Sequence, residues 1–127
     1  MSNLSQYRTG LASFSGEVFE NHGQLLKRVA RSVITDVIAG TPVDTGHARA
    51  NWQVGVNEVP TDELMIVDPD GAATTLKCLS QLSKSRAGDI ISVVNNVPYI
   101  DELENGHSGQ APNGIVAVAV ERAKLIG

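Results

Sequence analysis

The chain has 127 residues, of which 42% are hydrophobic and 19% charged, proportions typical of one globular domain and not of a disordered chain. Fourteen acidic residues against ten basic ones give a net charge of −4, which argues against a module that grips nucleic acid through a basic face. A single cysteine, Cys78, excludes an intrachain disulfide and a cysteine-based zinc site, and no apolar stretch reaches the roughly 18 residues that a membrane span needs. We expect one domain over residues 1–127, without a signal peptide and made in a reducing cytoplasm.

The N-terminal third predicts an arm followed by a long helix. Residues 1–14 are polar and short of apolar anchors, which indicates an arm that orders against a partner. From Gly16 to Ile38 the apolar residues recur at three- and four-residue steps, and Gly40 and Pro42 end the pattern. This periodicity predicts a helix over Gly16–Ile38. The side chains expected to face a sheet are Val29, Val33 and Val37.

A turn-rich stretch, residues 40–46, separates this helix from a predicted strand. Trp52, Val54 and Val56 alternate with polar residues or glycine, which is the period-two pattern of a half-buried strand. A second, short apolar run covers 64–67 and is closed by the turn sequence Asp-Pro-Asp-Gly at 68–71.

The middle of the chain predicts a helix and then a central strand. Apolar residues at helical spacing over 72–86 indicate a helix that Asp70 caps and Gly88 ends. Cys78 lies in this stretch and is interpreted as a small helix residue rather than a nucleophile. Ile90 to Val94 is a continuous β-rich apolar run, typical of a central strand.

The last third gives mixed signals. The segment 97–104 is compatible with one helical turn or two, and Asn105–Gly114 is a loop on composition. Over 115–120 β-branched residues alternate with alanine, which favours a strand, whereas 121–126 favours a helix. The pattern alone does not decide between the two.

A metal or catalytic role has little support in the residue spacing. Asp101, Glu104 and His107 would share a helical face at three-residue steps, but Gly106 ends any helix there. The tripeptide Asp44-Thr45-Gly46 resembles that of aspartic proteases, yet only one copy exists. A structural turn is favoured, with Asp44 bonding backbone amides and Gly46 supplying a positive φ.

Two blocks of sequence resemble a known family. The first is Thr41-Pro-Val-Asp-Thr-Gly46 followed by Arg49 and Trp52, similar to the motif Pro-Val-Asp-Thr-Gly-x-x-Arg-x-x-Trp. The second runs from Val94-Asn-Asn-Val-Pro-Tyr-Ile into Leu103-Glu-Asn-Gly-His-Ser-Gly-Gln-Ala-Pro-Asn-Gly114. They stand in the order found in the neck, or tail-completion, proteins of tailed bacteriophages, which are also called minor tail proteins. His47 stands where that family is expected to have arginine or leucine.

The resemblance implies an α+β fold, in which a long N-terminal helix packs on a small, mostly antiparallel sheet, with a middle helix and a C-terminal helix. The C-terminal helix is then expected over 112–126. The resemblance also implies head-tail joining: a six- or twelve-fold ring of copies of this chain between the head connector or adaptor and the tail terminator or tail tube. DNA would pass through the lumen without sequence-specific binding, and the virion would assemble in the host bacterial cytoplasm. The resemblance implies neither catalysis nor a cofactor, and we expect no enzymatic activity, cofactor or metal site here.

The two blocks also supply the candidate assembly surface. We further expect an ion pair between Arg49 and Glu104 to tie the blocks together, the alternative being that both charges point into water. The candidate assembly residues are Asp44, Thr45, Gly46, Arg49, Trp52, Pro98, Tyr99, Glu104, Gly106, His107, Ser108, Gln110 and Pro112.

Two alternative functions stay open on the sequence. One is a tail terminator that caps the tail tube, a virion protein of similar size. The other is a small metal-dependent hydrolase that uses His107, Glu104 and Asp44.

Overall fold

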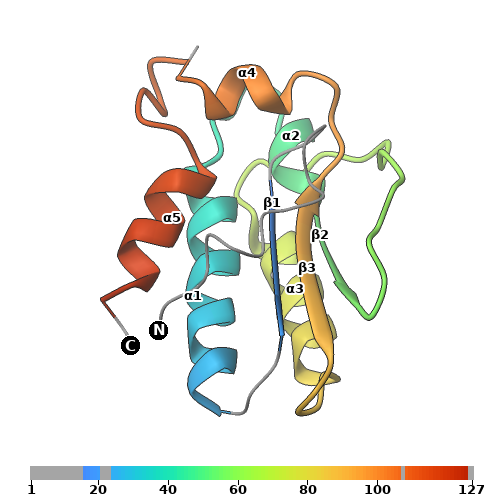
Figure 1. The fold of residues 1–127 in the computed structure, drawn as a ribbon. Helices are drawn as coiled ribbons and strands as arrows, with labels where there is room; N and C mark the ends of the chain where they lie inside the picture. Colours follow the sequence, from blue (N-terminus) through green and yellow to red (C-terminus); the bar gives the residue numbers. More distant parts are fainter. Residues whose placement is uncertain (1–15, 21–23, 107, 126–127) are drawn as a thin grey trace.

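The computed structural model describes residues 16–20, 24–106 and 108–125, which form an α+β domain (Figure 1). The predicted arm, residues 1–14, lies outside the described residues. The sheet has three antiparallel strands in the order β1-β3-β2. In chain order the elements are β1 (Gly16–Glu20), α1 (Gln24–Gly40), α2 (His47–Ala50), β2 (Trp52–Val56), α3 (Ala72–Ser83), β3 (Ile90–Asn95), α4 (Ile100–Glu104) and α5 (Val116–Ala123).

The first part of the expected Gly16–Ile38 helix is wrong. Gly16–Glu20 is strand β1, paired antiparallel with β3, and the helix α1 begins only at Gln24. Valine and phenylalanine at positions 18 and 19 suit a strand as well as a helix. Pairing with β3, about 70 residues further along the chain, decides between the two, and helical periodicity contains no information about that pairing.

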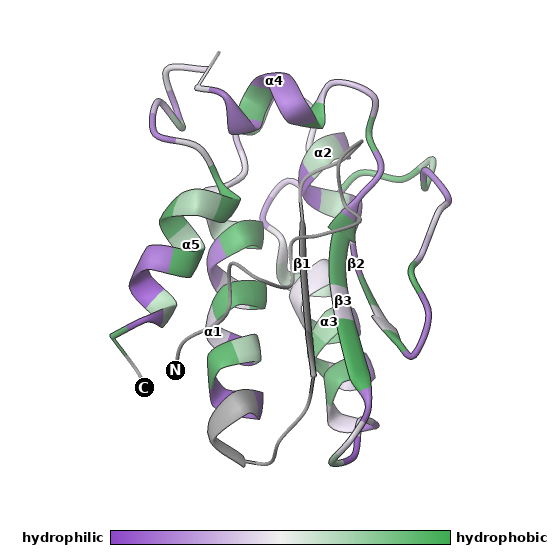
Figure 2. Ribbon diagram, in the orientation of Figure 1, coloured by the Kyte–Doolittle hydropathy of each residue, from purple (hydrophilic) through white to green (hydrophobic). Residues whose placement is uncertain are grey.

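The predicted strands and the core face of α1 are confirmed. Val29, Val33 and Val37 are buried in one apolar cluster with residues of β2 and β3. Within the sheet, Val54 lies opposite Val93 on the face that contributes to this cluster. Helix α1 lies against both α5 and α3, and α3 packs on β2. In Figure 2, β3 is hydrophobic over most of its length, as expected for the central strand, whereas α4 is largely hydrophilic.

Helix α3 begins as predicted but ends early. Asp70 accepts a hydrogen bond from the backbone N–H of Ala72, and Asp68 accepts from both the N–H and the hydroxyl of Thr74. The helix stops at Ser83, not at Gly88, because the backbone N–H of Ser85 turns back to the carbonyl of Leu82. The apolar run at 64–67 forms no strand and lies in the loop that leads from β2 to α3.

The C-terminal helix is shorter than the expected 112–126. It covers Val116–Ala123, and Gly114, with a φ of 94°, precedes it in a turn.

Among the described residues, no helix combines the length and the apolar character that crossing a bilayer requires.

Candidate functional site

The two family-like blocks meet at one end of the molecule, where α2 and α4 lie (Figure 1). Between them is a cleft of about 210 Å³. It is lined from the first block by residues 42–48 and from the second block by Tyr99, Leu103, Ser108 and Gln110. The structure therefore brings together segments that are more than 50 residues apart in sequence.

The side chain of Gln110 joins the two blocks directly. Its Oε1 accepts a hydrogen bond from the backbone N–H of Val43 at 3.0 Å, and its Nε2 donates to the Val43 carbonyl at 3.2 Å. The amide thus makes the paired donor and acceptor contacts that a neighbouring β-strand would make. Ala111, the next residue, is 6% exposed, so the loop is also anchored by burial directly after the contact.

Trp52 belongs to the interior and not to the assembly surface. It is 0% exposed, and its indole Nε1 donates to the Thr41 hydroxyl at 2.7 Å. Thr41 in turn donates to the carbonyl of Val37 near the end of α1. Trp52 is therefore not available as the assembly residue it was expected to be, and an indole ring whose N–H is satisfied is well suited to a core. Its role is to fix the first block to α1.

Arg49 holds the main chain around the site in place. Its guanidinium donates to three carbonyl oxygens, those of Ala39 at 3.0 Å, Thr41 at 2.9 Å and Pro69 at 2.8 Å. These bonds join the end of α1 to the turn before α3. The Nε atom is buried and has no partner in the part of the chain that the structure describes.

The expected ion pair between Arg49 and Glu104 is wrong, and so is the alternative in which both charges point into water. Glu104 instead accepts from the first backbone N–H groups of α5, with Oε1 bonding Ile115 and Val116 at 3.0 and 2.7 Å and Oε2 bonding Ala117 at 3.0 Å. The first N–H groups of a helix have no partner within the helix, and a carboxylate there is favoured by the helix dipole. Glu104 therefore sets the point at which α5 begins.

The Asp44–Gly46 segment is a turn, as predicted, but with different hydrogen bonds. Gly46 has a φ of 93°, and a Cβ at this position would lie 2.6 Å from the backbone N of Pro69. The Thr45 hydroxyl, rather than the Asp44 carboxylate, accepts the hydrogen bond from the N–H of His47. Asp44 is exposed and makes no hydrogen bond to any residue that the structure describes. Its carboxylate is therefore available at the surface.

His47 anchors the loop that follows β2. Its Nδ1 lies 2.9 Å from the carbonyl of Ile66, and its Nε2 lies 2.8 Å from a carboxylate oxygen of Glu63. Both partners are acceptors, so only the doubly protonated ring satisfies both contacts. The hydrogen bond to Glu63, followed by that to Ile66, raises the pKa of His47 above its ordinary value. The sequence marked His47 only as a departure from the family motif and gave no indication of Glu63.

The remaining candidates differ in how far they are exposed to solvent. Tyr99 is 41% exposed and lines the cleft, and partial burial, then the nearby charges of Glu63 and Asp44, raise the pKa of its phenol. Pro98 and Pro112 are exposed. Gly106 and Ser108 are half-buried, Gly46 is buried, and His107 lies outside the described residues.

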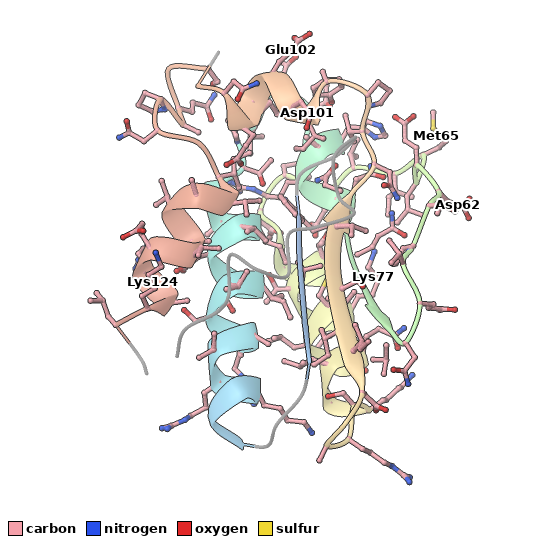
Figure 3. The ribbon with its side chains drawn as sticks, viewed as in Figure 1. Asp62, Met65, Lys77, Asp101, Glu102 and Lys124 are labelled. Atoms are coloured by element: carbon pink, nitrogen blue, oxygen red, sulfur yellow. The ribbon has the colours of Figure 1, made fainter. Side chains whose placement is uncertain are left out.

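The described residues contain no cluster of three histidine, cysteine or acidic side chains able to hold a metal ion. Glu102 lies on α4 and points away from the body of the molecule (Figure 3). Cys78 lies on helix α3 as predicted; it is 1% exposed, and burial raises the pKa of its thiol to about 11.

The chain matches no protein-family model, no curated protein and no solved structure.

Proposed function

We propose that this chain is a structural neck protein of a tailed bacteriophage, which joins the head connector to the tail as a ring around the DNA channel. The observation that carries the proposal is the convergence of the two family-like blocks on one cleft, with Gln110 bonded to Val43. In the sequence the blocks are separate stretches. In the fold they form one surface, as a docking site requires.

The chemistry of this surface supports docking of a protein and not of a small molecule. The volume of the cleft, about 210 Å³, lies below the roughly 300–1,000 Å³ usual for ligand pockets. Around it lie exposed polar groups and one half-exposed aromatic ring, those of Asp44, Thr45, Gln110 and Tyr99. Tyrosine is enriched at protein interfaces, because it combines apolar area with a hydrogen-bonding hydroxyl.

A ring of six or twelve copies requires a heterologous contact, in which one face of each copy meets a different face of the next. The net charge of −4 agrees with a protein that surrounds DNA without holding it, because acidic groups at a lumen repel phosphates. The tail terminator or tail tube would meet the ring on its other side.

The test is complementation in the phage that encodes this chain. Tyr99→Arg places a long charged side chain over the cleft, and Val118→Arg, on α5, is the matched control because Val118 is 40% exposed against 41% for Tyr99. We expect Tyr99→Arg to abolish the joining of heads to tails in electron micrographs and Val118→Arg to preserve it. Both variants should melt within a few degrees of the parent, since surface substitutions usually change stability by less than about 0.5 kcal/mol. Normal joining with Tyr99→Arg would contradict the assignment of this surface.

A further inference from the structure

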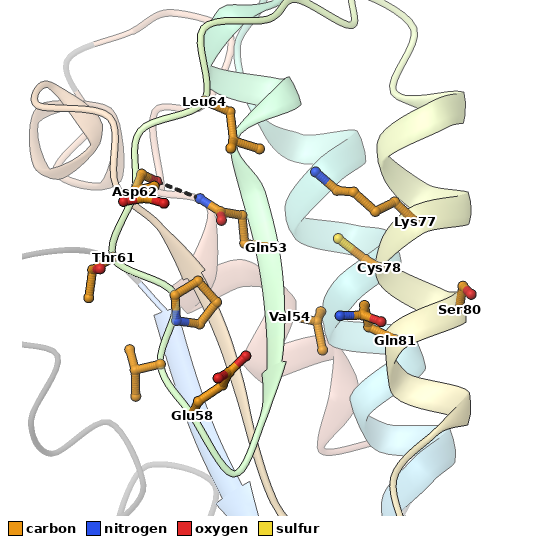
Figure 4. A pocket seen from close by; sticks show the side chains of 12 residues that line it. Gln53, Val54, Glu58, Thr61, Asp62, Leu64, Lys77, Cys78, Ser80 and Gln81 are labelled. Carbon is orange, nitrogen blue, oxygen red and sulfur yellow. Dashed lines mark hydrogen bonds between the residues drawn. The ribbon is translucent and has the colours of Figure 1, made fainter.

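A second and larger groove, of about 590 Å³, lies between the free edge of β2, the loop over 58–64 and α3 (Figure 4). Strand β2 is at the edge of the sheet, since among the described strands it pairs with β3 alone. In Figure 4 the strand runs along the groove, with Asp62 and Leu64 on one side and Lys77, Cys78 and Gln81 on the other. The groove is thus an open slot beside a strand edge.

The hydrogen bonds between β2 and β3 show which main-chain N–H and C=O groups of β2 face the groove. The N–H of Asn57, just after β2, donates to the carbonyl of Ile90 at 2.7 Å, and the N–H of Ile90 donates to the side-chain Oδ1 of Asn57 at 2.9 Å, so both main-chain groups of Ile90 face the β2 side. Because hydrogen-bonded pairs alternate along an antiparallel ladder, Gln53 and Gly55 also bond to β3. The main-chain groups of Val54 and Val56 therefore point outward, away from β3.

A separate contact agrees with this alternation. The Cys78 thiol of α3 lies 3.3 Å from the carbonyl oxygen of Trp52, which is two residues before Val54 and has the same orientation. The N–H and C=O groups of Val54 and Val56 have no hydrogen-bond partner among the described residues. Val54 is only 5% exposed. Unpaired main-chain groups along a strand edge form a template for one further strand.

We propose that the groove binds an extended segment as a fourth strand on β2, and that the segment is the N-terminal arm, residues 1–14, of a second copy of this chain. The inference rests on the proposed function, since it supplies the heterologous contact that a ring needs. The arm precedes β1 at one edge of the sheet, and the groove lies at the other edge. Each copy would donate from the first edge and accept at the second, a heterologous arrangement that forms a ring when the rotation between neighbouring copies closes.

Length and charge both favour the arm as the occupant. Fourteen extended residues span up to roughly 46 Å, enough to reach a neighbouring domain. The arm contains one basic residue, Arg8, and no acidic residue. The groove is lined by the acidic Glu58 and Asp62 and the single basic Lys77, so its charge is opposite to that of the arm.

The test uses amide hydrogen exchange of the full chain, followed by NMR at a concentration where the chain is monomeric, with a synthetic peptide of residues 1–14 as the probe. At saturating peptide we expect exchange at Val54 and Val56 to slow roughly tenfold, because about nine tenths of the molecules then pair these amides. The amides of Gln53 and Gly55, already bonded to β3, should change little. A peptide with Arg8→Glu should bind several-fold more weakly, and a scrambled peptide should give no protection.

A pair of variants makes the outcome specific to the groove. Ser80 is exposed on α3 and lines the groove, so Ser80→Trp should abolish the protection, whereas Ser83→Trp, exposed on the same helix but outside the groove, should preserve it. No protection at about 1 mM peptide would overturn the proposal, since that concentration detects even millimolar affinity. Val54 and Val56 amides already protected in the free monomer would also overturn it, because the arm would then occupy its own groove. Both results concern the purified chain alone. They are therefore distinguishable from a failure of the proposed neck function, which is tested by imaging assembled particles.

Discussion

Replacing Glu104 with alanine removes the acceptor on which the start of α5 depends. The carboxylate accepts hydrogen bonds from the N–H groups of Ile115, Val116 and Ala117. Ile115 and Val116 are 1% and 0% exposed, so water replaces the lost acceptor poorly at these two residues. Helix α5 contributes Val116, Ala119, Val120 and Ala123 to the core, so loosening its first turn disturbs the packing against α1.

The expected loss is about 3 kcal/mol of unfolding free energy. Losing a helix cap costs typically about 1 kcal/mol, and leaving a further buried donor without its charged partner costs about 2 kcal/mol. In a domain of this size the melting temperature should fall by roughly 10 °C. Urea unfolding followed by circular dichroism measures the change, provided that the slope of the transition is unaltered.

Two further variants serve as controls for Glu104→Ala. Glu102→Ala removes an exposed side chain from α4, the helix that also carries Glu104, and should change stability by less than about 0.5 kcal/mol. Glu104→Gln keeps one carbonyl acceptor without the charge and should lose about half as much as Glu104→Ala. If Glu104→Ala is as stable as Glu102→Ala, the carboxylate does not support α5 and the reasoning is refuted.

Three other predictions concern the core, the turn and the histidine. Val33→Asp should cost at least about 3 kcal/mol because Val33 is 0% exposed, whereas Thr35→Asp, exposed on the same helix, should cost less than about 0.5 kcal/mol in the same urea assay. Gly46→Ala should cost about 3 kcal/mol, since its φ is 93° and its methyl group would lie against Pro69; a melting temperature equal to that of the parent would contradict this. The pKa of His47 is raised in the folded state, so its contribution to stability is fully present below about pH 6.5 and is lost as the pH rises through the folded pKa. The difference in unfolding free energy between the parent and His47→Ala should therefore be larger at pH 6 than at pH 8, and the opposite trend would contradict the contacts with Glu63 and Ile66.

Features that depend on local pattern were predictable from the sequence. The three- and four-residue spacing of Val29, Val33 and Val37 identified the buried face of α1, and the alternation from Trp52 identified β2. The positive φ at Gly46 followed from its place in a turn. In each case the deciding interactions lie within a few residues of one another, or depend only on whether a side chain is apolar.

Features that depend on distant main-chain partners were not predictable. Arg49 was expected to find a carboxylate, but it binds carbonyl oxygens, which every residue carries and no sequence pattern distinguishes. Glu104 determines where α5 begins from eleven residues away, and Gln110 reaches Val43 across 67 positions. The two blocks lie together in the fold, but the contacts that join them could only be found in the folded chain.

The proposed neck function is tested most directly by removing the gene for this chain from the phage that the proposal takes to encode it and imaging the particles that then assemble. If the chain joins heads to tails, DNA-filled heads without tails will accumulate beside finished tails of normal length, and joined particles will form again once the purified protein is added. Joined, infectious particles formed without the protein would contradict the account, and tails of uncontrolled length would contradict it in favour of a tail terminator.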